Sequence, residues 1–205
     1  MLHLSTIKPD VLALLKEIFR IPFIKSNFGL AGGTSLALQI GHRNSIDLDI
    51  FSPEKFPPAD LENLLAGKFP QKYEPKGKMQ TMLFCNISGI KCDFVNEPFP
   101  LVSPFIRENE ITFYSIPDIC AMKMHTVCGR GKKKDFFDIY ALLKLYGWNK
   151  MLEWFEHRYS KSQLFFLWKS ITYFEDAEND PEINGIPPYT ATWGEIKKYI
   201  TLQCR

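Results

Sequence analysis

Residues 28–51 decide the fold, and they read FGLAGGTSLALQIGHRNSIDLDIF. The first four residues are apolar and predict a short strand, after which Gly32 and Gly33 give the chain a tight turn. A helix follows, for which Thr34 or Ser35 is the expected N-cap. The stretch ends in a second strand, so the glycine turn is expected close to one end of that strand.

The second strand, residues 46–51, contains two acids, Asp47 and Asp49, which alternate with apolar residues. Alternate residues of a strand point to the same side, so both carboxylates leave one face. Two like charges at this spacing repel each other, and a divalent cation between them keeps both ionised. We therefore expect a metal site, with Mg²⁺ favoured because no His or Cys cluster offers a zinc site. The alternative is a solvated edge strand that happens to carry two acids.

The glycine turn predicts a phosphate site beside the metal. Backbone N–H groups at a turn into a helix are free to bind an anion, and Gly33 and Ser35 lie where such an anion would sit. Arg43 is a candidate phosphate clamp or the partner of a surface acid, and His42 is more simply a local hydrogen-bond partner. A phosphate cradle next to a hard-metal site indicates phosphoryl chemistry.

An α/β unit is expected over residues 1–116. Its helices are predicted over residues 11–19 and 57–66, and its later strands over residues 71–74, 80–87, 90–95 and 111–116. Asp93 is an acid inside one of these apolar strands. It is either a half-exposed acid with an arginine partner, or a third carboxylate that completes a two-metal site or acts as general base.

From residue 117 onward the apolar pattern is helical. Helices are predicted over residues 117–127, 134–146, 148–157, 163–174 and 192–202, with a proline-rich surface loop over residues 176–191. The expected fold is therefore α+β: a mixed sheet with flanking helices in residues 1–116, followed by a helical bundle in residues 117–205.

A second group of charged residues lies in this helical part. Lys123 precedes Arg130 by seven residues, so both can share a helix face, and Asp135 and Asp138 share the face of the next helix after Lys134. One interpretation is a solvated basic loop followed by acids near a helix N-terminus. The other is a pair of helices that face a nucleotide.

The composition of the chain indicates where the protein is expected to be located, but it does not indicate its function. The net charge of +2 neither requires nor excludes a nucleic-acid partner. Five cysteines without a CxxC pair are expected to be reduced thiols. No export signal is visible, and no stretch approaches the roughly 20 uncharged apolar residues of a membrane span, so we expect a cytoplasmic protein without a membrane partner.

Two blocks of this sequence resemble known families. Residues 31–33 with Asp47-Leu48-Asp49 resemble the signature of the polymerase-β-like nucleotidyltransferase superfamily. Their joint occurrence with Lys123 and RGKKKDFFD at residues 130–138 is similar to the AbiEii/AbiGii toxin family. The resemblance implies Mg²⁺-dependent transfer of a nucleotide from an NTP to an acceptor, with tRNA or another RNA as the candidate. It also implies a toxin role neutralised by a separately encoded antitoxin.

The resemblance also implies roles for individual residues. Asp47 and Asp49 would be ligands of a site that holds two metal ions when NTP is bound, and Lys123 and Asp135 would complete the catalytic set. Asp93 is added as the third carboxylate from its place in the predicted strand. Taken together with the glycine turn and Arg43, the resemblance gives as expected nucleotide-binding residues Gly32, Gly33, Thr34, Ser35, Arg43, Lys123, Arg130, Lys134 and Asp138. Two other functions stay open at this point, namely a non-catalytic nucleotide- or RNA-binding module and a metal-dependent phosphodiesterase.

Overall fold

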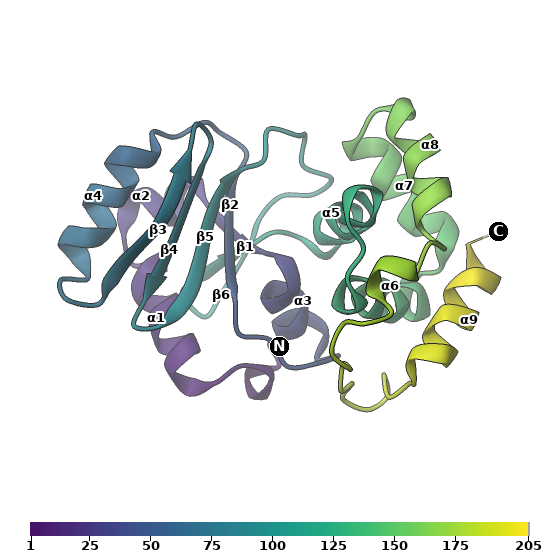
Figure 1. Ribbon diagram of the computed structural model, residues 1–205. Helices are drawn as coiled ribbons and strands as arrows, with labels where there is room; N and C mark the ends of the chain where they lie inside the picture. The colour runs from purple at the N-terminus through teal and green to yellow at the C-terminus, as the bar shows by residue number, and fades with distance from the viewer. Residues whose placement is uncertain (205) are drawn as a thin grey trace.

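The computed structural model describes residues 1–204 and contains one sheet surrounded by helices (Figure 1). The strands are β1 (Gly29–Ala31), β2 (Leu48–Ser52), β3 (Tyr73–Met79), β4 (Met82–Ile87), β5 (Ile90–Asn96), β6 (Ile106–Glu108) and β7 (Ile111–Phe113). The helices are α1 (Pro9–Phe19), α2 (Pro22–Asn27), α3 (Gly32–Ile40), α4 (Pro58–Lys68), α5 (Ile116–Gly129), α6 (Lys133–Tyr146), α7 (Trp148–Arg158), α8 (Lys161–Ser170) and α9 (Trp193–Gln203).

The sheet is mixed, with strand order β3-β4-β5-β2-β1-β7-β6. The central strand β2 runs antiparallel to β1 and parallel to β5. This register places Asp49 opposite Ala31 on one side and opposite Asp93 on the other. The predicted mixed sheet with flanking helices and a helical C-terminal region is confirmed.

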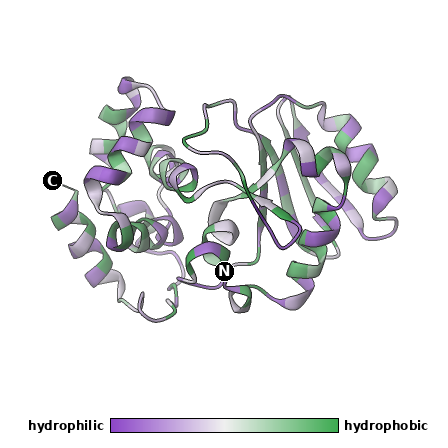
Figure 2. Ribbon diagram, turned by 180° about the vertical axis from the view of Figure 1, so that it is seen from behind, coloured by the Kyte–Doolittle hydropathy of each residue, from purple (hydrophilic) through white to green (hydrophobic). Residues whose placement is uncertain are grey.

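The two faces of the sheet are covered differently. Helices α1, α2 and α4 pack on one face, against buried apolar residues such as Leu48, Ile50 and Phe94 (Figure 1). Side chains alternate along a strand, so Asp49 and Asp93 point to the opposite face, on the side of α5 and α6. Figure 2 shows that the outer helices carry both hydrophobic and hydrophilic residues, as helices with one buried side do.

The helices from α5 to α9 share a second apolar cluster. Ala31, Leu36 and Tyr114 from the N-terminal part also belong to this cluster, so packing crosses the predicted boundary at residue 117. Because the two parts share this cluster, their division into separate units at residues 116 and 117 stays a prediction. Within residues 1–204, no helix combines the length and the apolar character that crossing a membrane requires.

Helix α3 begins earlier than the sequence predicts. It starts at Gly32, whose φ of +65° lets the chain turn directly from β1 into the helix. Thr34 and Ser35 consequently lie in the first turn and neither is the N-cap. The Thr34 hydroxyl donates to the Asp47 carbonyl, and the Ser35 hydroxyl accepts a hydrogen bond of 3.0 Å from Gln39.

Two short elements escaped prediction. Helix α1 ends at Phe19 as predicted, and Pro22 then occupies the first turn of α2, where its missing N–H costs no hydrogen bond. Strand β6 lies between β5 and β7 and has only three residues, too few to show an alternating pattern.

Candidate active site

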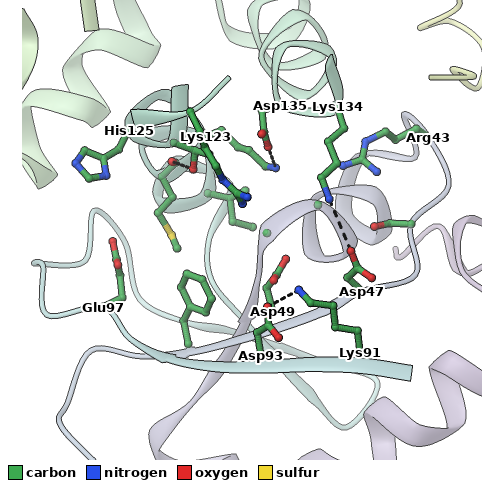
Figure 3. A pocket seen from close by; sticks show the side chains of 18 of the residues that line it. Arg43, Asp47, Asp49, Lys91, Asp93, Glu97, Lys123, His125, Lys134 and Asp135 are labelled. Atoms are coloured by element: carbon green, nitrogen blue, oxygen red, sulfur yellow. Dashed lines mark hydrogen bonds and ion pairs between the residues drawn. The ribbon is translucent and has the colours of Figure 1, made fainter. Parts of the chain in front are cut away.

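A pocket of about 210 Å³ lies between the acid-bearing face of the sheet and helices α5 and α6 (Figure 3). Of the residues that the sequence singled out, its lining includes Gly32, Gly33, Arg43, Asp47, Asp49, Asp93, Lys123, Arg130, Lys134 and Asp135. The other three, Thr34, Ser35 and Asp138, are fully buried and do not line it. The fold thus brings the two charged sequence blocks to one cavity.

The sheet wall of the pocket carries three carboxylates. Asp49 and Asp93 are register partners on the parallel strands β2 and β5, and Asp47 lies two residues before Asp49. The Lys91 ammonium donates to Asp93, and Lys134 Nζ lies 3.7 Å from the Asp47 carboxylate (Figure 3). Two lysines therefore balance part of the negative charge on this wall.

The carboxylates of the sheet wall suit a divalent cation. Burial raises the pKa of the Asp49 carboxyl; the charge of Lys123 opposes this shift, and the neighbouring Asp93 carboxylate adds to it. Asp93 Oδ1 is buried without a hydrogen-bond partner. A hard cation would satisfy this oxygen and relieve the repulsion. In the part of the chain that the structure describes, no three His, Cys, Asp or Glu side chains already lie close enough together to hold a metal ion.

The two glycines of the turn are required by the side chains that close over them. A Cβ on Gly32 would lie 2.1 Å from Asp49 Oδ2, and a Cβ on Gly33 would lie 2.3 Å from Arg43 Nη2. Both separations are far below van der Waals contact. The glycine pair therefore lets one acid and one base of the pocket approach the start of α3, in addition to forming the predicted turn.

The helix wall is built around a buried ion-pair network. Lys123 of α5 donates to Asp135 at 2.8 Å, and its Nζ lies 2.7 Å from Asp138; both acids are on α6. Arg43 donates to Asp138 through two groups, Nε at 2.6 Å and Nη2 at 3.0 Å. His42 Nε2 lies 2.7 Å from the same carboxylate. Asp138 thus joins the loop before β2 to helices α5 and α6.

The charges of this network stabilise one another. Burial alone would raise the pKa of Asp138, but Arg43 and Lys123 hold it well below its usual range. Burial alone would lower the pKa of Lys123, but Asp138 and Asp135 raise it. Burial lowers the pKa of His42 in spite of its contact with Asp138. The helix wall is therefore a compensated set of charges at neutral pH.

Three of the residues expected to bind the nucleotide do not line the pocket. The buried positions of Thr34, Ser35 and Asp138 suit a supporting role, because their side chains hydrogen-bond within the protein and do not line the pocket. The His42 interpretation as a local hydrogen-bond partner matches its placement beside Asp138.

The pocket also contains residues that the sequence did not single out. Lys91 lies two residues before Asp93 on the same face of β5, so the alternation of that strand could have found it. Glu97 follows the end of β5, outside the range of that pattern. His125 and Tyr159 line the pocket as well, and nothing in their local sequence marks them.

Comparison with known proteins is consistent with this geometry. The family model described as "Nucleotidyl transferase AbiEii toxin, Type IV TA system" matches residues 88–201. A curated relative, protein aq_aa25 of Aquifex aeolicus (strain VF5), is 32% identical over 187 residues, which cover 86% of this chain and 85% of that protein. The name of this relative assigns it no activity.

Solved structures support the fold. A candidate nucleotidyltransferase from H. pylori superimposes with a TM-score of 0.56 at 18% identity, covering 98% of this chain and 92% of its own. The nucleotidyltransferase toxin MenT4 from Mycobacterium tuberculosis H37Rv gives 0.53 at 10% identity, covering 95% and 81%. Fold, paired charge blocks and family match agree, and the chain belongs to the AbiEii family of nucleotidyltransferase toxins of type IV toxin–antitoxin systems.

Proposed function

We propose that this nucleotidyltransferase moves a nucleotide from an NTP to an RNA acceptor, with tRNA as the candidate, in a Mg²⁺-dependent reaction. The observation that carries the proposal is the arrangement of the pocket. Three carboxylates of the sheet face the Lys123–Asp135 pair of the helices, and the glycine turn and Arg43 lie at the same cavity. The type IV family implies a separately encoded antitoxin that counters this activity.

Asp47, Asp49 and Asp93 would hold the metal, since they are the carboxylates on the sheet wall. When bound, Mg²⁺ would lower the pKa of an acceptor hydroxyl and neutralise charge on the leaving pyrophosphate. The helix wall is less suited to this task, because Asp138 is enclosed by Arg43 and Lys123 and does not line the pocket. Asp135 is paired with the buried Lys123, whereas the Lys91 partner of Asp93 is exposed.

The triphosphate would lie toward Arg43, Lys134 and Arg130, the cationic side of the pocket. The first N–H groups of α3 would add hydrogen-bond donors there. Asp138 would act as a positioning residue, because it holds Arg43 in a bidentate pair and holds Lys123 from behind. Residues 1–116 and 117–205 both supply the site, so the reaction would require both predicted units.

The test is transfer of label from each of four α-³²P-labelled NTPs to total tRNA, with Mg²⁺ and with EDTA. Wild-type protein should label the RNA only with Mg²⁺, and Asp47→Ala should give no transfer. Mass spectrometry of the product RNA would identify the donor and the acceptor. Folded, Mg²⁺-loaded protein that labels no RNA with any NTP would refute the proposal. Loss of phosphate from the substrate without gain of label would indicate a phosphodiesterase instead.

A further inference from the structure

The pocket has two chemically different ends. Near the glycine turn it presents Arg43 and Lys134, both cations. At the other end it presents Glu97 and His125 (Figure 3), with Tyr159 in contact with both. A carboxylate repels phosphate and an aromatic ring offers it no charge, so this second end is suited to a different part of a nucleotide.

Glu97 is held at a defined place along the sheet wall. It follows directly after β5, which ends at Asn96, and its backbone N–H donates to the Ser52 carbonyl at 2.8 Å. Its side chain is 17% exposed, and its Oε1 accepts a hydrogen bond of 3.0 Å from the Tyr159 hydroxyl. Arg158 Nη2 lies 3.6 Å from the same oxygen. Within residues 1–204, the Tyr159 hydroxyl is the one hydrogen-bond donor to the Glu97 carboxylate, so Oε2 remains able to accept another hydrogen bond.

An aromatic wall stands beside Glu97. The His125 ring stacks on Tyr159 with centroids 4.3 Å apart and planes 11° apart, and Phe99 packs edge-on to Tyr159 at 4.8 Å. Burial lowers the pKa of His125, so its ring is a neutral flat surface at physiological pH. Phe51 also lines the pocket, two residues after Asp49 on the pocket face of β2. Flat uncharged rings of this kind stack on nucleobases of any sequence.

We propose that Glu97, His125 and Tyr159 form the nucleobase subsite, and that Glu97 favours a base with an amino group over uracil. The inference rests on the proposed function, because it assigns the orientation of the nucleotide in that site. A carboxylate oxygen only accepts hydrogen bonds, and the amino groups of adenine, guanine and cytosine donate them. Uracil presents a carbonyl oxygen where cytosine has its amino group, so two acceptors would face each other.

The test measures dissociation constants of ATP, GTP, CTP and UTP with Mg²⁺ for wild-type protein and for Glu97→Gln. Glutamine keeps an oxygen for the Tyr159 hydroxyl and turns an N–H donor toward the pocket. Wild-type protein should bind UTP most weakly. Glu97→Gln should bind UTP more tightly and lower the CTP preference over UTP by at least about tenfold, the effect of one hydrogen bond to a charged group. A gain in UTP binding is not what structural damage produces.

His125→Ala is the matched variant. It removes stacking and should weaken all four NTPs by about tenfold while leaving their order unchanged. If circular dichroism shows that Glu97→Gln does not fold, Tyr159→Phe replaces it. This variant keeps the ring but removes the hydroxyl that fixes Glu97 in place, so the carboxylate is no longer held toward the base and the CTP preference over UTP should fall.

Three outcomes are decisive. UTP binding as tight as that of the other NTPs by wild-type protein overturns the subsite, and so does an unchanged CTP-to-UTP ratio in the folded variant. In both cases the protein still binds NTPs, so the proposed nucleotidyltransferase function is not contradicted. If wild-type protein binds none of the four NTPs, both the proposed function and this inference are wrong.

Discussion

The two walls of the pocket carry the same kind of residue in opposite environments. On the sheet wall, burial raises the pKa of Asp49, and the neighbouring Asp93 carboxylate adds to this shift. On the helix wall, Arg43 and Lys123 hold the pKa of Asp138 well below its usual range. Carboxylates whose surroundings separate their pKa values in this way commonly have different tasks. We interpret the sheet wall as the metal-binding side and the helix wall as the support that positions its cations.

The largest expected effect concerns the support side. Asp138→Asn removes the negative charge that compensates Arg43 and Lys123, so the free energy of unfolding should fall by about 3 to 5 kcal/mol. Asp49→Asn is the matched variant on the sheet wall; it should abolish label transfer without loss of stability, since it removes a like charge from beside Asp93. Urea denaturation of both variants makes the comparison. Equal losses of stability would show that the two walls do not differ as described.

A smaller effect is expected at the turn where the walls meet. Gly33→Ala places a methyl group 2.3 Å from Arg43 Nη2, and Arg43 cannot move freely because Asp138 holds it. The free energy of unfolding should fall by about 1 to 3 kcal/mol. Gly194→Ala is the control, since a Cβ there has open space around it. If both alanine variants were equally stable in urea, the close approach of Arg43 to the turn would be wrong.

The smallest effect is the dependence of stability on pH. Asp138, with a lowered pKa, contributes stability that is present above its unfolded pKa of about 3.9 and is lost as pH falls through its folded pKa. Asp49, with a raised pKa, does the reverse: stability falls as pH rises from about 3.9 through its folded pKa. Unfolding free energies between pH 2 and pH 7 should therefore flatten on the acid side in Asp138→Asn and above pH 4 in Asp49→Asn. Curves that stay parallel to wild type in both variants would contradict this assignment.

Local sequence patterns predicted much of the fold. Alternation placed Asp49 on one strand face, and the glycine pair predicted the turn into α3, because both features depend on neighbouring residues only. The same rule, applied two residues before Asp93, would have added Lys91.

The rest of the site depends on contacts that no local pattern reports. Arg43 and Asp138 are 95 residues apart in the chain, and their pairing required the helical part to be placed against the sheet. The stacking of His125 on Tyr159 likewise joins α5 to the end of α7. Arg43 and Asp138 were each singled out from the sequence, but their pairing was not, and His125 and Tyr159 were not singled out at all.

The bond between Arg43 and Asp138 also sets an order of events during synthesis. The chain leaves the ribosome from its N-terminus, so the strands that bear Asp49 and Asp93 emerge well before α6. Until Asp138 has emerged, Arg43 and Lys123 lack the carboxylate that holds them in place. The ion-pair network of the helix wall is therefore completed only after about two thirds of the chain has been made. A product that stops before α6 would carry the acids of the sheet wall without the wall that faces them.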